Sequence, residues 1–220
     1  MEILRENKLY ALILLVLIGH MFWLKFQFQE IIYIIDYLGR ILLIGIACYV
    51  FQFKIEQFID RTKLVTISKF WLVLLSTGLI LIFAPFNELF FGLFDPYNNL
   101  KWNYFPLTKN LYLKIFDLTV GLILVAVAEG LIFRKLFLEV LTKQRFSNIS
   151  VYLISSSLFA LLHLYQSVQI TIGAFIAGLV LMYVYKKSGT LWVPIVSHYL
   201  VNLYFFGIRI PFVRTVNVPL

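Results

Sequence analysis

The chain has 220 residues, of which 61% are hydrophobic and only 14% are charged, and its formal net charge is +8. Soluble domains carry about 25% charged residues, so this composition and a mean hydropathy of +0.90 exclude an ordinary soluble fold. The positive charge does not indicate nucleic acid, because the basic residues fall mostly between apolar runs, as they do in membrane proteins. We therefore expect a single integral membrane domain over residues 1–220.

Seven apolar segments predict an all-α polytopic membrane helix bundle with about seven transmembrane helices, within a range of roughly six to eight. In chain order they cover residues 9–24, 31–53, 70–86, 111–141, 149–165, 170–185 and 191–208. The fourth would be about 45 Å long at a rise of 1.5 Å per residue. It must therefore tilt, extend beyond the bilayer or break near Gly130.

The basic residues also predict the orientation of the chain. With the N-terminus on the cytoplasmic side, the inner loops hold more lysine and arginine than the outer ones. We therefore expect a multi-pass protein of the cell membrane with a cytoplasmic N-terminus.

The fourth segment places Glu129 and Arg134 in the middle of an apolar run. An ionised side chain at the centre of a membrane helix costs at least about 2.5–3.5 kcal/mol, so it is usually paired, solvated in a cavity or functional. Two interpretations are open: a structural ion pair that holds helices in register, or a general base at Glu129. The two residues are five positions apart, about 140° around an α-helix, and so should not share a face.

Two later segments carry polar pairs at a four-residue spacing. Phe159 and His163 share one helix face in the fifth segment, and His198 and Asn202 share one in the seventh. A lone membrane histidine is often a core residue bonded to a backbone carbonyl, but a second histidine and a buried acid favour a common polar site. The rise per residue of an α-helix puts Glu129 and His163 at a similar depth in the membrane. It puts His198 and Asn202 a turn or two lower.

In their order and spacing these residues resemble the CAAX-protease and bacteriocin-processing family of intramembrane proteases (CPBP or Abi), which includes the type II CAAX prenyl endopeptidases. The family pattern is Glu-Glu-x-x-x-Arg, then Phe-x-x-x-His, then His-x-x-x-Asn. The matching residues are Glu129 with Arg134, Phe159 with His163, and His198 with Asn202. The resemblance covers about 120–206, and the core helices that bear the motifs would span 111–208. One departure is that the second Glu of the pattern is Gly130 here.

The resemblance implies an intramembrane endopeptidase that hydrolyses a peptide bond of a small membrane-associated or leader-bearing peptide. Glu129 would activate water with help from His163, while His198 and Asn202 would stabilise the oxyanion; Arg134 and Phe159 would support them. No cofactor is expected. Zinc suits Glu129, His163 and His198 by ligand type, but a metal-free mechanism is favoured because Glu129 cannot easily be both ligand and base. The expected partners are a peptide or membrane-protein substrate and the bilayer, with no nucleic acid.

Two other accounts stay open. Because of Gly130, the chain could be a catalytically inactive family member that acts as a bacteriocin-immunity or regulatory membrane protein. The first Glu and the other motif residues are all present, which favours activity. A third account makes His163 and His198 haem ligands or relay groups of a transport protein, as membrane histidines can be.

Overall fold

The computed structural model describes residues 29–51, 66–94, 110–164 and 166–209 of the protein. Across these ranges the regular elements are all helices and no strand is present, which confirms the predicted all-α class. Three of the described helices are long and apolar enough to cross a membrane: Ser68–Asn87, Leu111–Lys143 and Val168–Ser188. The predicted first span, 9–24, lies outside the described residues.

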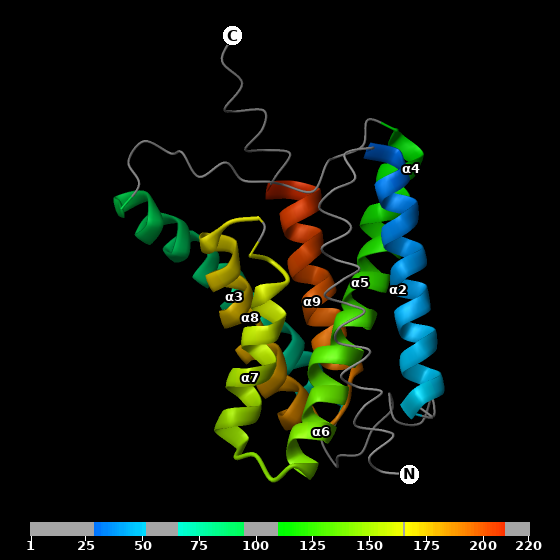
Figure 1. Cartoon of the computed structure of the whole chain (residues 1–220). Coiled ribbons are helices and arrows are strands. Elements are labelled where there is room, and N and C mark those ends of the chain that lie inside the picture. The colour runs from blue at the N-terminus through cyan, green and yellow to red at the C-terminus, as the bar shows by residue number, and fades with distance from the viewer. Residues whose placement is uncertain (1–28, 52–65, 95–109, 165, 210–220) are drawn as a thin grey trace.

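The described helices follow the other six predicted segments in chain order. They are α2 (Gln29–Phe51), α3 (Thr66–Phe94), a composite helix that contains α4, α5 and α6 (Leu111–Lys143), α7 (Asn148–Leu161), α8 (Val168–Ser188) and α9 (Trp192–Tyr204) with a π-helical turn η4 (Phe205–Arg209). Successive helices run in opposite directions, as consecutive membrane spans do (Figure 1).

The largest differences from the predicted segments are at the ends of α3 and α7. Helix α3 continues to Phe94 instead of ending at residue 86. Helix α7 ends at Leu161 instead of residue 165, because its last turn tightens into hydrogen bonds between residues three apart, such as His163 N–H to Ala160 O at 2.8 Å. His163 therefore lies in the turn that follows α7 and not within the helix.

The predicted fourth segment is one helix of 33 residues, Leu111–Lys143, and it does not break at Gly130. Instead the hydrogen bonding changes from α to π at two places, η2 (Asp117–Gly121) and η3 (Gly130–Leu136). Such wider turns are rare and are frequent at functional sites. Within η3 the carbonyl of Phe133 accepts a hydrogen bond from the Ser155 hydroxyl of α7, so the wider turn is tied to the neighbouring helix.

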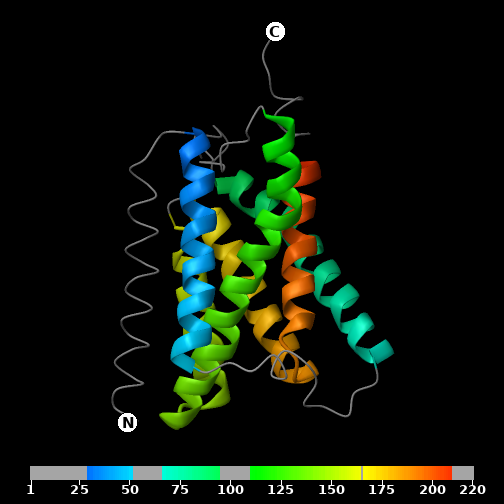
Figure 2. The same cartoon turned by 90° about the vertical axis from the view of Figure 1, so that its right-hand side faces the viewer.

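Helix α9 lies at the centre of the bundle, between α5 (Leu122–Glu129) on one side and α8 on the other (Figure 1). Helix α2 packs against α5 in both views (Figures 1 and 2), and α3 crosses obliquely against α8 and α9. At the contact between α7 and α8, a Cβ added to Gly178 would lie 3.1 Å from Ser156 Cα. Small residues thus allow the two backbones to approach closely, as is usual between membrane helices.

The chain reverses between α8 and α9 at a glycine. Gly189 has φ 66°, a left-handed conformation that favours glycine, and its N–H donates to Tyr185 O at 2.9 Å to close the end of α8. Helix α9 then begins at Trp192, with Pro194 in its first turn, where a missing N–H costs nothing. This turn sends His198 and Asn202 back up through the centre of the bundle.

Candidate active site

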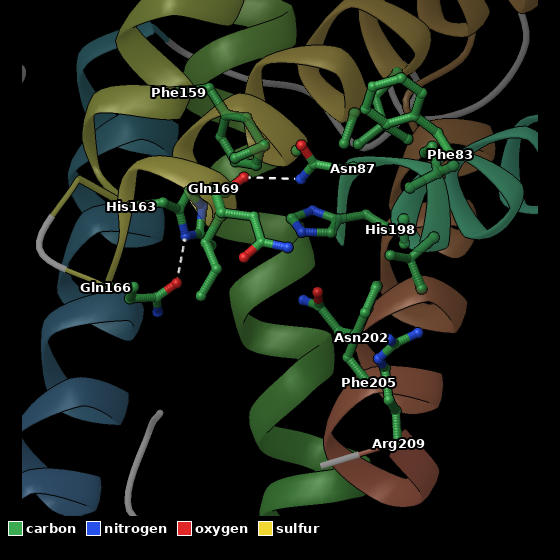
Figure 3. A pocket seen from close by; sticks show the side chains of 18 of the residues that line it. Phe83, Asn87, Phe159, His163, Gln166, Gln169, His198, Asn202, Phe205 and Arg209 are labelled. Atoms are coloured by element: carbon green, nitrogen blue, oxygen red, sulfur yellow. Dashed lines mark hydrogen bonds between the residues drawn. The ribbon is translucent and has the colours of Figure 1, made fainter. Parts of the chain in front are cut away.

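The predicted site residues come from three parts of the bundle. Glu129 is the last residue of α5, and Arg134 lies in the following turn η3. Phe159 is on α7, and His198 is on α9. Figure 3 shows Phe159, His163, His198 and Asn202 around one cavity of about 310 Å³.

The carboxylate of Glu129 is held between two other helices. Its Oε1 accepts a hydrogen bond from Arg40 Nη1 of α2 at 3.2 Å, and its Oε2 lies 3.6 Å from His198 Nε2. The residue is buried, at 8% exposure, and Oε2 has no hydrogen-bond partner within the protein. The acid therefore has one oxygen fixed by a cation and one that faces an imidazole.

Arg134 reaches the main chain of Glu129, although an α-helix would place the two on different faces. In the π-helical turn, residues five apart are hydrogen-bonding neighbours, and Arg134 Nη1 donates to Glu129 O at 3.4 Å. The guanidinium carbon also lies 4.4 Å from the centre of the Phe159 ring, a cation–π contact. The ion pair of the Glu129 carboxylate is thus with Arg40, and Arg134 instead ties η3 to α7.

Phe159 orders the two histidines. Its ring centre is 5.2 Å from that of His163 and 5.7 Å from that of His198, edge-to-face in both cases. His163 Nδ1 lies 3.3 Å from Gln166 Oε1, while its Nε2 is buried without a partner in the protein. If Nδ1 donates to the amide oxygen, Nε2 of the neutral ring is an acceptor.

The cavity wall is mostly apolar and is supplied by α3, α8 and α9 with η4. Four polar lining residues were not singled out from the sequence: Asn87, Gln166, Gln169 and Arg209. Asn87 Nδ2 donates to Gln169 O at 2.9 Å, so α3 is fixed to the start of α8 at the cavity edge (Figure 3). Glu129 is not among the lining residues, and His198 is the group that connects this acid to the cavity.

Glu129, His163 and His198 are zinc ligands by type. In the part of the chain that the structure describes, no three His, Cys, Asp or Glu side chains are grouped so that they could hold a metal ion. The nearest charged neighbour of the Glu129 carboxylate is instead the Arg40 guanidinium.

Arg40 was the most informative residue that sequence analysis did not assign to the site. It stands inside the apolar segment 31–53, four residues after Asp36, and that isolated acid–base pair was the available signal. Their Nε and Oδ2 atoms are 2.8 Å apart. A charged pair in a membrane helix generally faces the bundle interior, as it does here.

These features define a helical membrane protein with an acid, two histidines and an amide gathered beside a mostly apolar cavity. The family model described as type II CAAX prenyl endopeptidase Rce1-like matches residues 111–204. This match confirms the predicted resemblance to the CPBP family, a family of intramembrane proteases, over residues 111–204. Comparisons with curated proteins and with solved structures gave no match.

Proposed function

We propose that the protein is an active intramembrane endopeptidase, which hydrolyses a peptide bond of a small membrane-associated or leader-bearing peptide. The supporting observation is the approach of His198 Nε2 to Glu129 Oε2 at 3.6 Å. His198 also lines the cavity together with His163 and Asn202. An acid and two imidazoles beside an apolar cavity are suited to activating water against a bound amide.

In this proposal Glu129 is the general base. Because Oε1 is bonded to Arg40, the proton of the attacking water goes to Oε2, which has no partner in the protein. His163 assists through Nε2, the ring nitrogen that Gln166 leaves unbonded. The water oxygen bonds to the scissile carbon, and the proton is then delivered to the departing nitrogen, so that one water is consumed per bond broken.

His198 and Asn202 are the proposed oxyanion donors. They lie one turn apart on α9 and both line the cavity, so a ring N–H and an amide N–H can meet the same carbonyl oxygen. Donors fixed in a site that excludes bulk water are each worth about 2.7–4 kcal/mol of barrier. Phe159 and Arg134 support the site by ordering the imidazoles and the turn that follows Glu129.

The alternative is a catalytically inactive member that binds a bacteriocin or a partner membrane protein. The observation behind it is Gly130, where an added Cβ would lie 3.0 Å from Ile195 Cγ1, so the site is packed without a second acid. A binding protein of this kind would not need the proton affinity of Glu129. Its function would survive the replacement of the acid by its amide.

Glu129→Gln in the full-length protein, reconstituted in liposomes, separates the two functions. We expect cleavage of a membrane-associated peptide library to be lost in Glu129→Gln and in His163→Ala. The control is Tyr199→Phe, which lies next to His198 but bonds the main chain at Leu118 O. Cleavage by Glu129→Gln at the wild-type rate would overturn the proposal, whereas immunity or partner binding that is unchanged in this variant would support the alternative.

We also propose that the protein is a multi-pass protein of the cell membrane with its N-terminus in the cytoplasm. In that orientation the turn between α6 (Phe137–Lys143) and α7 is cytoplasmic, and its Lys143 and Arg145 agree with the positive-inside rule. A cysteine introduced at exposed Arg145 should react with a permeant maleimide but not with an impermeant one applied to whole cells. Labelling by the impermeant reagent would place Arg145 outside the cell and would contradict the proposed orientation.

A further inference from the structure

Helix α2 lies outside the residues matched by the family model, 111–204, yet it contacts the proposed base. We infer that Arg40, braced by Asp36, is a positioning residue for Glu129, so that α2 completes the active site. This inference rests on the proposed function, because it concerns the same carboxylate.

One planar group connects two acids from different helices. Arg40 Nε donates to Asp36 Oδ2 at 2.8 Å, and Arg40 Nη1 donates to Glu129 Oε1 at 3.2 Å. The Arg40 side chain is 18% exposed, and those of Asp36 and Glu129 are 16% and 10% exposed. Since the guanidinium is a rigid fork, fixing one edge on Asp36 also fixes the direction of the other edge toward Glu129.

The position of the acid matters because a second cation is close by. Arg134 bonds the main-chain oxygen of Glu129 through Nη1, and its buried Nη2 has no partner in the protein. Without Arg40, the Glu129 carboxylate would be free to turn toward this guanidinium and away from His198. Arg40 therefore holds the acid in the orientation in which Oε2 faces the imidazole.

The charges of this cluster balance without a second glutamate. Asp36 and Glu129 supply two negative charges when ionised, and Arg40 and Arg134 supply two positive ones. An acid at position 130 would add an unbalanced charge in a buried place, which is costly.

A second contact between α2 and the long helix provides a matched control. Tyr37 OH donates to Asp117 Oδ1 at 2.7 Å, one turn before Arg40 on the same helix. An added Cβ at Gly121 would lie 2.8 Å from Tyr37 Cε1, so this is a closely packed interface. Tyr37→Phe removes a hydrogen bond from that interface without touching Glu129.

The test measures kcat and KM for Arg40→Met, Arg40→Lys and Tyr37→Phe in the full-length reconstituted protein, with a peptide that the wild type cleaves. A displaced catalytic group of this kind costs about 100-fold, so kcat of Arg40→Met should fall by about that factor while KM changes less than about threefold. Arg40→Lys retains a cation but not the rigid fork, and should fall between Arg40→Met and the wild type. Tyr37→Phe should remain within about threefold of the wild type in kcat.

Two results would overturn the inference: wild-type kcat in a folded Arg40→Met protein, or an equal loss in Tyr37→Phe. If Arg40→Met does not fold, Arg40→Lys decides, since a wild-type kcat in that variant contradicts positioning and a selective loss supports it. Glu129→Gln distinguishes failure of the proposed function from failure of the inference about Arg40. If it cleaves normally, the proposed function and this inference fail together; if it is inactive while the Arg40 variants behave as wild type, only the inference fails.

Discussion

His198 Nε2 lies 3.6 Å from Glu129 Oε2, and the two residues belong to neighbouring helices that run in opposite directions, α9 and α5 (Figure 1). Both side chains are buried, so neither can exchange its polar neighbour for bulk water. The contact also connects the acid to the cavity, which Glu129 does not itself line. Substitution of His198 is therefore the most direct test of the connection between Glu129 and the cavity.

We predict that His198→Gln lowers kcat by about 100-fold, the usual cost of misplacing a catalytic group. Glutamine keeps a similar volume and an amide donor, but its flexible side chain does not keep the edge-to-face contact with Phe159. The measurement is peptide cleavage by the reconstituted protein, alongside its thermal midpoint in detergent. An unchanged kcat with an unchanged midpoint would remove His198 from the catalytic group.

Gly130→Glu restores the acidic pair of the family pattern, and we predict that it lowers stability without raising activity. An added Cβ would lie 3.0 Å from Ile195 Cγ1, and overpacking of this kind costs about 1–3 kcal/mol. The carboxylate would be buried as well, which adds to the cost. The double variant with Ile195→Ala should recover part of the thermal midpoint. A more active and equally stable Gly130→Glu protein would contradict this prediction and would show that Gly130 lowers the activity of the wild type.

Gly178→Ala should destabilise the bundle by about 1–3 kcal/mol, because the new methyl group meets a helix backbone that cannot move aside. Its Cβ would lie 3.0 Å from Ser156 Cβ and 3.2 Å from Phe159 Cδ1. Displacing Phe159 would also disturb both histidines, so cleavage should decrease together with the unfolding midpoint.

Gly78→Ala on α3 is the matched control for this substitution, since nothing lies within 4 Å of its added Cβ. Alanine is favoured over glycine in a helix by about 1 kcal/mol, so the midpoint of this variant should stay the same or rise. Equal destabilisation of both variants would mean that the contact between α7 and α8 is not tight.

The sequence predicted the helical class, the six described segments and four residues that line the cavity, because apolar run length and four-residue spacing are local properties. Glu129 and Arg134, also predicted for the site, do not line it. His198 with Asn202 follows directly from the periodicity of α9, whereas His163 contacts Phe159 from the turn that follows α7. The expected offset in depth between the two residues does not keep their side chains apart, since His198 Nε2 lies 3.6 Å from Glu129 Oε2. Estimates of depth from loop boundaries accumulate errors of a few residues, about one helical turn.

Two features of the site could not be predicted from local pattern. The π-helical turn brings Arg134 back over the carbonyl of Glu129, where an α-helix would have separated them. Arg40 pairs with Glu129 across a long stretch of chain, and such a contact depends on which helices pack together. An isolated acid–base pair in an apolar helix indicates a buried face but does not name its partner.

Removal of metal ions should leave cleavage unchanged. Glu129 Oε1 already accepts a hydrogen bond from Arg40, and Arg134 is also close, so a divalent cation bound to the Glu129 carboxylate would lie beside two positive charges. Their mutual repulsion in a buried site is large, because low polarity strengthens interactions between charges. We therefore expect equal rates before and after treatment with EDTA and 1,10-phenanthroline, and no stoichiometric zinc in the purified protein by mass spectrometry. Loss of cleavage on chelation, with recovery when zinc alone is added back, would contradict the glutamate mechanism and would predict that Arg40→Met binds the metal more tightly than the wild type.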